Sequence, residues 1–301
     1  MGLFSNYENA GPGIPKAPQE KTDFFKFFEI YGRRFWKLME INLLYFIFYL
    51  PLFFGLALFF ADSNKVSDNT KIVGISALAI IFIATIGPAT AGFTKIIRNY
   101  SQERNAFVFA DFFDTFKKCY KQSLIMGIID TIFAVGFVIA VVSYSEWAQQ
   151  NSVMYLPFII CLSCMLMFIM MHFYIYLLVV STNLTLFQII KNSFLLVVIS
   201  VKRCLLNLII LAILLFLFLY LYAIYPYSIF IVPFLPLSFC CFLICFNCYP
   251  FIRKYVIQPY YKARGEESPE FDYLKDDGET VFEDKGGTEA PIKKQRKRSI
   301  K

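Results

Sequence analysis

The sequence predicts an all-α fold, a polytopic transmembrane helical bundle of about six spans with amphipathic helices at the membrane interface. Composition is the first observation: of 301 residues, 58% are hydrophobic and 19% aromatic, and the mean hydropathy is +0.57. These values exceed those of ordinary soluble domains. The second observation is that Lys and Arg fall almost entirely in alternate connections between long apolar stretches, as in multi-pass membrane proteins.

The apolar stretches have the length that a membrane-spanning helix needs. A helix rises about 1.5 Å per residue and must cross about 30 Å of hydrocarbon, so each span takes roughly 20 residues. Suitable stretches lie near 41–60, 72–94, 122–143, 153–180, 205–223 and 229–250. They are continuous, whereas the strands of a membrane barrel would be short and alternating, so helices are favoured.

Charge predicts the orientation. Basic residues collect before the first span, between the second and third, between the fourth and fifth, and after the sixth. The other connections carry only two basic residues, Lys65 and Lys71, and the second of them carries the acidic Glu146. Because Lys and Arg favour the cytoplasmic side, we expect both termini to be cytoplasmic in a multi-pass protein of the cell (plasma) membrane. No basic region followed by an apolar core opens the chain, so we expect no cleavable signal peptide.

Three amphipathic segments each precede an odd-numbered span. They are residues 24–38, 109–120 and 186–194. In the second, five aromatic residues recur at the three- and four-residue steps of a helix: Phe109, Phe112, Phe113, Phe116 and Tyr120. We expect such helices to lie in the membrane interface. Their spacing of about 80 residues favours a threefold parallel repeat of one interfacial helix and two spans.

Three regions follow from this pattern. Residues 1–23 form an N-terminal cytoplasmic segment, 24–264 the six-span membrane domain, and 265–301 a charged cytoplasmic tail. The tail is acidic first and basic at its end, which predicts disorder with the basic end on lipid headgroups; a docking peptide for a cytoplasmic partner is the alternative. The basic residues behind the net charge of +7 would lie against anionic headgroups at the cytoplasmic face, so a nucleic acid partner is not required to explain this charge.

The most specific local motif lies in the second span. It contains Gly87, Pro88, Thr90, Ala91 and Gly92. Proline lacks an amide proton and clashes with the preceding turn, which predicts a kink, while the small residues let another helix approach closely. Two interpretations stay open: a kinked packing face, or a broken helix that lines a substrate path.

Several short motifs, in order, resemble a known family. They are residues 1–13, 35–38, 42–45, 87–92 and 111–118. The chain resembles the YesL family of bacterial membrane proteins, which is domain-of-unknown-function family 624, most specifically over about residues 1–130. Its members are typically encoded beside carbohydrate uptake systems and their sensors. The resemblance therefore implies an accessory role in saccharide import, and it carries over no catalytic residue.

Two ionisable residues fall inside predicted spans. Asp130 lies in the third span and His172, the single histidine, in the fourth. Each is about eight or nine residues from the cytoplasmic end, or roughly 12–14 Å deep at the helical rise. Charges in hydrocarbon are costly and usually paired, so we hypothesise that these two residues pair. The pair either holds two helices together or acts as a proton relay or substrate contact.

The remaining motifs give no enzyme or cofactor site. Of eight cysteines, Cys161 with Cys164 and Cys245 with Cys248 have a metal-like spacing. The predicted depths of the two pairs differ by roughly 12 Å at the helical rise, so we expect packing roles and no metal. Phosphate-binding glycine loops and zinc-protease motifs are missing. We expect no catalytic residues and no cofactor.

Three functions remain compatible with the sequence. The first is a non-enzymatic accessory or regulatory subunit that docks onto the permease of an ABC-type carbohydrate transporter or onto a sensor kinase. The second is an autonomous small-molecule transporter or channel, with the kinked second span and the Asp130 and His172 level along its path. The third is a purely structural, lipid-interacting protein.

Overall fold

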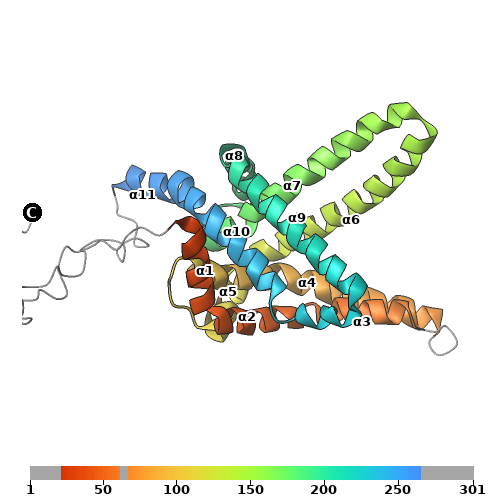
Figure 1. Ribbon diagram of the computed structural model, residues 1–301, viewed down its shortest axis with the longest axis horizontal. Helices are drawn as coiled ribbons and strands as arrows, with labels where there is room; N and C mark the ends of the chain where they lie inside the picture. The colour runs from red at the N-terminus through yellow and green to blue at the C-terminus, as the bar shows by residue number, and fades with distance from the viewer. Residues whose placement is uncertain (1–21, 62–66, 266–301) are drawn as a thin grey trace, which may run out of the picture. The chain divides into compact units, whose positions relative to one another are not determined.

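The computed structural model describes residues 22–61 and 67–265 (Figure 1). The first motif of the family resemblance, Lys65 and nearly all of the charged tail lie outside these residues. The described part is helical: α1 (Asp23–Arg33), α2 (Phe35–Ile47), α3 (Leu50–Phe59), α4 (Asp68–Ser101), α5 (Val108–Lys118), α6 (Tyr120–Gln150), α7 (Tyr155–Ser181), α8 (Leu186–Ile199), α9 (Val201–Ile224), α10 (Pro236–Ile252) and α11 (Gln258–Arg264).

Five of the described helical segments are long and apolar enough to cross a membrane. They are Asp68–Ser101, Tyr120–Gln150, Ser152–Ser181, Val201–Ile224 and Pro236–Arg264. A sixth is obtained when α2 and α3, which meet at an angle of 46°, count as one bent span. The chain is a multi-pass membrane protein.

The first expected span, 41–60, is not one straight helix. Helix α2 ends at Ile47, and α3 begins at Leu50 with Pro51 in its first turn. A proline ring clashes with the carbonyl group four residues earlier, which here belongs to Ile47. Pro51 therefore accounts for the break.

The last expected span, 229–250, begins too early. Pro226–Ile231 is a short 3-10 helix, and α10 starts only at Pro236. The fully buried Asn42 of α2 donates to the carbonyl oxygens of Val232 (3.0 Å) and Pro233 (2.8 Å) and accepts from the Ser238 amide (2.7 Å). An irregular segment needs such partners because backbone groups at membrane depth must be bonded within the protein.

A single residue separates each of the short helices α1, α5 and α8 from the span that follows it; α1 and α5 are amphipathic, whereas α8 is largely apolar. Arg34 separates α1 from α2, Cys119 separates α5 from α6, and Ser200 separates α8 from α9. Their backbone angles are alike, with φ/ψ of −107°/10°, −94°/6° and −113°/27°. The expected interfacial segment 24–38 therefore ends at Arg33, because residues 35–38 already belong to the span. We call the end of the bundle that holds these three residues the junction end, and the opposite end the tip end.

The returning helices α4, α7 and α10 form the centre of the described bundle, where each contacts the other two. Their halves near the junction end are buried and contribute Ile96, Ile97, Tyr174, Ile175, Leu178, Phe242, Cys245 and Ile252. Towards the tip end, side chains of the same helices such as Ile72 of α4 and Ile159 of α7 are exposed, as lipid-facing residues would be. The core therefore lies at the junction end.

Each short helix packs against the returning helix of the unit before it. Helix α5 lies on α4, and α8 lies on α7. Helix α1 closes the circle on α10: the ring centroid of Phe27 lies 5.2 Å from that of Phe242, and Tyr31 lies 5.2 Å from Phe239. The same packing relationship thus occurs three times.

Candidate functional site

The structure brings Asp130 and His172 together between α6 and α7. The Nδ1 atom of His172 lies 3.6 Å from Oδ1 of Asp130. The hydroxyl group of Tyr176, one turn further along α7, donates to Oδ2 of Asp130 at 2.9 Å. The rings of His172 and Tyr176 meet edge to face, with centroids 5.3 Å apart. Carboxylate, imidazole and phenol therefore form one contiguous group.

Burial differs between the members of this group. The Asp130 side chain is 18% exposed and that of His172 is 43% exposed. Oδ1 of Asp130 is buried and accepts no hydrogen bond. A buried carboxylate oxygen is costly without a partner, and a protonated His172 would supply one. The arrangement can tie α6 to α7, and it contains the groups that proton exchange requires.

The glycine motif of α4 forms a close helix crossing. A Cβ atom at Gly127 of α6 would lie 3.0 Å from the Cα atom of Gly87, and one at Gly87 would overlap the backbone carbonyl of Ser123. At Gly92, a Cβ atom would lie 3.0 Å from the ring of Phe112 on α5. Pro88 lies inside α4, which continues through it as one helix. The motif therefore packs α4 against both α5 and α6.

Hydroxyl groups extend from this crossing. Thr90 donates to the Ile86 carbonyl (2.7 Å) and lies 2.8 Å from the hydroxyl oxygen of Tyr45 on α2. A Cβ atom at Gly127 would lie 3.9 Å from the Tyr176 hydroxyl, so the crossing adjoins the Asp130 group. Ala91 is buried. The sequence reasoning missed Tyr176, although its four-residue spacing from His172 places both on one helix face.

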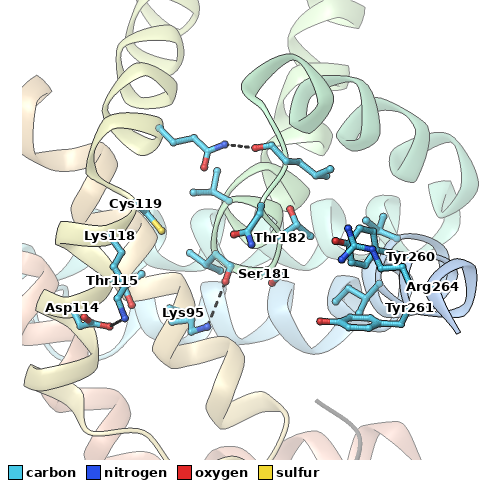
Figure 2. Close-up of a pocket in the computed structure, with 17 residues that line it drawn as sticks. Lys95, Asp114, Thr115, Lys118, Cys119, Ser181, Thr182, Tyr260, Tyr261 and Arg264 are labelled. Carbon is cyan, nitrogen blue, oxygen red and sulfur yellow. Dashed lines mark hydrogen bonds and ion pairs between the residues drawn. The ribbon is translucent and has the colours of Figure 1, made fainter. Parts of the chain in front are cut away.

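A cavity of about 720 Å³ opens at the junction end (Figure 2). Its walls come from four separate parts of the chain: Lys95 on α4, residues 114–122 across the α5–α6 junction, residues 179–184 at the end of α7, and residues 256–264 in and before α11. Because these segments are far apart in sequence, no local motif could have indicated the cavity. Asp130 and His172 do not line it.

Basic groups predominate among the charged residues of the cavity. The Nζ atom of Lys95 lies 3.5 Å from the Val180 carbonyl oxygen. Lys118 forms an ion pair with Asp114 at 2.7 Å, and Arg264 stacks on the Tyr260 ring at 4.4 Å from its centroid (Figure 2). The part of the lining that the structure describes thus has three basic side chains and one acidic side chain.

The cavity also has neutral polar groups. Gln122 donates to the carbonyl oxygen of Leu184 at 2.6 Å, which fixes the connection after α7 against the start of α6. Cys119 is half-buried, and burial raises the pKa of its thiol, an effect that the neighbouring Lys95 opposes. The thiol is therefore protonated at neutral pH and acts as a neutral wall.

A buried arginine joins the three central helices beside the cavity. Arg98 of α4 donates to the Ser181 hydroxyl at 2.8 Å, and its guanidinium lies 5.3 Å from the ring centroid of Tyr249 on α10. Ser181 is the last residue of α7, where a positive charge is favoured by the helix dipole. Arg98 therefore fixes the relative positions of α4, α7 and α10 at the junction end.

The cysteine pairs lie on different helices. Cys161 and Cys164 are on α7, whereas Cys245 and Cys248 are buried in α10, and all eight cysteines are free thiols. Within residues 22–61 and 67–265, no three His, Cys, Asp or Glu side chains gather closely enough to hold a metal ion.

One family model matches the chain. Residues 38–144 match the family described as "Protein of unknown function, DUF624", a segment that extends from α2 into α6 and includes the glycine motif and Asp130. No curated protein and no solved structure matches the chain.

Proposed function

We propose that the protein, which contains a DUF624 family domain at residues 38–144, is a non-enzymatic accessory or regulatory membrane protein associated with carbohydrate uptake. Its junction end faces the cytoplasm and docks onto a transporter permease or a sensor kinase. The family resemblance supports the link to uptake, and the four features below support the docking role.

Charge supports the cytoplasmic orientation. Arg33, Arg34 and Lys37 flank the first junction, and Lys117, Lys118 and Lys121 flank the second. Near the tip end, Lys71 binds the Ala61 carbonyl at 2.6 Å. Lys and Arg near span ends favour the cytoplasmic side, so the junction end is assigned there.

The filled centre of the bundle carries the proposal. Ile97 of α4, Leu178 of α7 and Ile252 of α10 are each no more than 1% exposed, and they belong to the packed halves of the three central helices. A substrate path along the bundle axis would have to displace these side chains, because protein cores are close-packed. A role that depends on binding at the surface therefore fits the core better than conduction through it.

Exposed aromatic residues supply a docking surface. On α1, Phe27 and Tyr31 are buried against α10, whereas Phe24 and Phe25 on the other side are each 66% exposed. Helix α5 likewise exposes Phe109 and Phe113. Aromatic residues are enriched at the centres of protein interfaces, so these second faces suit a partner helix at the membrane surface.

The repeated packing supports three tandem units. Each unit consists of a short helix, a junction residue, an outer span and a returning span, with junctions about 80 residues apart. An even number of spans per unit gives all three short helices the same orientation. The units therefore present three similar helices to the same side of the membrane.

Affinity purification tests the docking role. The tagged full-length protein is isolated from native membranes in a mild detergent, and its partners are identified by mass spectrometry against an untagged control. We expect stoichiometric recovery of a sugar permease or a sensor kinase. Recovery of the protein alone would contradict the proposal.

Matched variants locate the surface. Phe24→Ala with Phe25→Ala removes two exposed aromatic side chains of α1 at the junction end, whereas Phe59→Ala with Phe60→Ala removes two that are at least as exposed at the tip end. We expect only the first pair to reduce partner recovery. Equal recovery with both pairs would exclude α1 as the docking helix.

The Asp130 group favours a second candidate function, autonomous transport. Its buried carboxylate oxygen, which accepts no hydrogen bond and lies 3.6 Å from His172, is what a proton-coupled transporter would use. The test measures proton movement into reconstituted vesicles that contain a pH-sensitive dye. Substrate-dependent proton movement that is lost in Asp130→Asn would favour transport, and its absence would leave the accessory role.

A further inference from the structure

We propose that the cavity at the junction end binds a phosphate ester, supplied either by a lipid headgroup or by a soluble phosphorylated compound. This inference goes beyond the docking role and does not depend on it. Four features of the cavity carry it: its enclosure, its charge, its size and its position.

The cavity has a closed floor and an open rim. Thr115, Val180 and Ile257 are buried and form part of the floor, and Lys95 and Cys119 are half-buried. Lys118 and Arg264 are exposed and form part of the rim. A ligand can therefore enter between the end of α5 and α11 and reach a floor of buried residues.

The basic groups converge from three different helices. Lys95 belongs to α4, Lys118 to α5 and Arg264 to α11, and all three line one space in Figure 2. Charge-assisted hydrogen bonds to phosphate are roughly twice as strong as neutral ones. Among the described residues of the lining, Asp114 is the single acidic one, and its ion pair with Lys118 competes with an anion.

The size and the remaining lining define the class of ligand. A volume of about 720 Å³ is much larger than inorganic phosphate requires and lies in the range of small-molecule sites. Thr182 and Asn183 supply hydroxyl and amide groups, and the ring of Tyr261 supplies an aromatic surface. A phosphate ester with a polar, hydroxylated body matches this combination.

The position of the cavity admits both sources of phosphate. Helix α5, which borders it, is strongly amphipathic, as expected for a helix in the headgroup layer. A phospholipid headgroup can reach the rim from that layer, and a soluble ester can reach it from the aqueous side. Either ligand would bind the same basic side chains, Lys95, Lys118 and Arg264.

Native mass spectrometry of the full-length protein in neutral detergent tests the proposal. Phosphatidylglycerol, with phosphatidylcholine as its control, probes the lipid source, and glycerol 3-phosphate probes the soluble source. We expect one of these two anionic probes to bind saturably with one molecule per chain. Binding of neither would overturn the proposal.

A charge-matched pair of double variants tests the site itself. Lys118→Gln with Arg264→Gln removes two lining cations, whereas Lys117→Gln with Lys262→Gln removes two exposed cations from the same helices outside the cavity. We expect affinity to fall about tenfold in the first pair, the loss of one to two charge-assisted contacts, and to change less than about twofold in the second. Equal losses would indicate general electrostatic attraction and overturn the proposal.

A variant with increased affinity distinguishes a specific site from the effects of structural damage. Asp114→Asn removes the acidic competitor and frees Lys118 for the anion. We expect the affinity for the bound probe to rise severalfold, which damage to the fold cannot produce. Weaker binding in this variant would contradict the assignment.

Discussion

Gly87 and Gly127 place the backbones of α4 and α6 in direct contact: a Cβ atom at Gly127 would lie 3.0 Å from the Cα atom of Gly87. Backbone atoms cannot rotate away as a flexible side chain can. A side chain at either of these two positions would therefore push the helices apart, and the crossing fixes α6 at the level where Asp130 lies one turn away.

Gly127→Ala is expected to lower stability by about 1–3 kcal/mol, because the added methyl group must push two helices apart. Gly136 is the control on the same helix, since a Cβ atom there meets nothing within 4 Å. Gly136→Ala should be neutral or slightly stabilising, as alanine favours helices. The melting temperature of the detergent-solubilised protein distinguishes them, and equal values would refute the close crossing.

Tyr176→Phe is expected to destabilise the protein by about 1–3 kcal/mol, because it leaves the Asp130 carboxylate without its hydroxyl donor. In an Asp130→Leu background the same change should cost much less, since no carboxylate remains to be satisfied. Tyr220→Phe, at an exposed tyrosine, is the control. Additive effects in the double variant would show that the two residues are not coupled.

Asn42→Ala is expected to loosen the segment before α10. Two carbonyl oxygens and the Ser238 amide lose their partner together, so we expect a loss of about 2–4 kcal/mol. Hydrogen exchange followed by mass spectrometry should show faster exchange at Ser238 and its neighbours, with α6 unchanged. Uniform exchange across the protein would argue against this local role.

Cys119 should respond to pH as a thiol with a raised pKa. The folded state holds this proton more tightly than the unfolded state, so its contribution to stability is complete below the usual thiol pKa and is lost as pH rises through the raised value. The thiolate is the reactive form. In a variant with Cys119 as the single cysteine, the maleimide labelling rate should therefore keep rising at pH values where the denatured protein has levelled off. Matching pH profiles would contradict the burial of this thiol.

Hydropathy and charge were sufficient to predict an all-helical chain with about six spans, because length and apolar content are what a bilayer selects. The errors lie at prolines. Pro51 divides the first span into two helices, and the helix of the last span begins only at Pro236. Neither proline interrupts the apolar stretch from which the span was predicted. Depth counting also suggested the pairing of Asp130 with His172, which the structure brings within 3.6 Å.

The cavity could not be predicted from the sequence, for a physical reason. Lys95, Lys118 and Arg264 meet only because α4, α5 and α11 come together at the junction end. Their separation along the chain leaves no periodicity or local spacing to detect. The role of Asn42 could not be predicted for a similar reason. It depends on an irregular segment near Pro233, whereas the apolar composition of residues 229–250 had predicted a helix there.

The packing of α1 on α10 has a consequence for biosynthesis. The helix with Phe27 and Tyr31 leaves the ribosome first, and its partner surface with Phe239 and Phe242 leaves almost last. During translation the aromatic face of α1 therefore stays uncovered until α10 has been synthesised and inserted. A chain that stops before α10 would keep the aromatic face of α1 uncovered, and such exposed apolar surface is prone to aggregation.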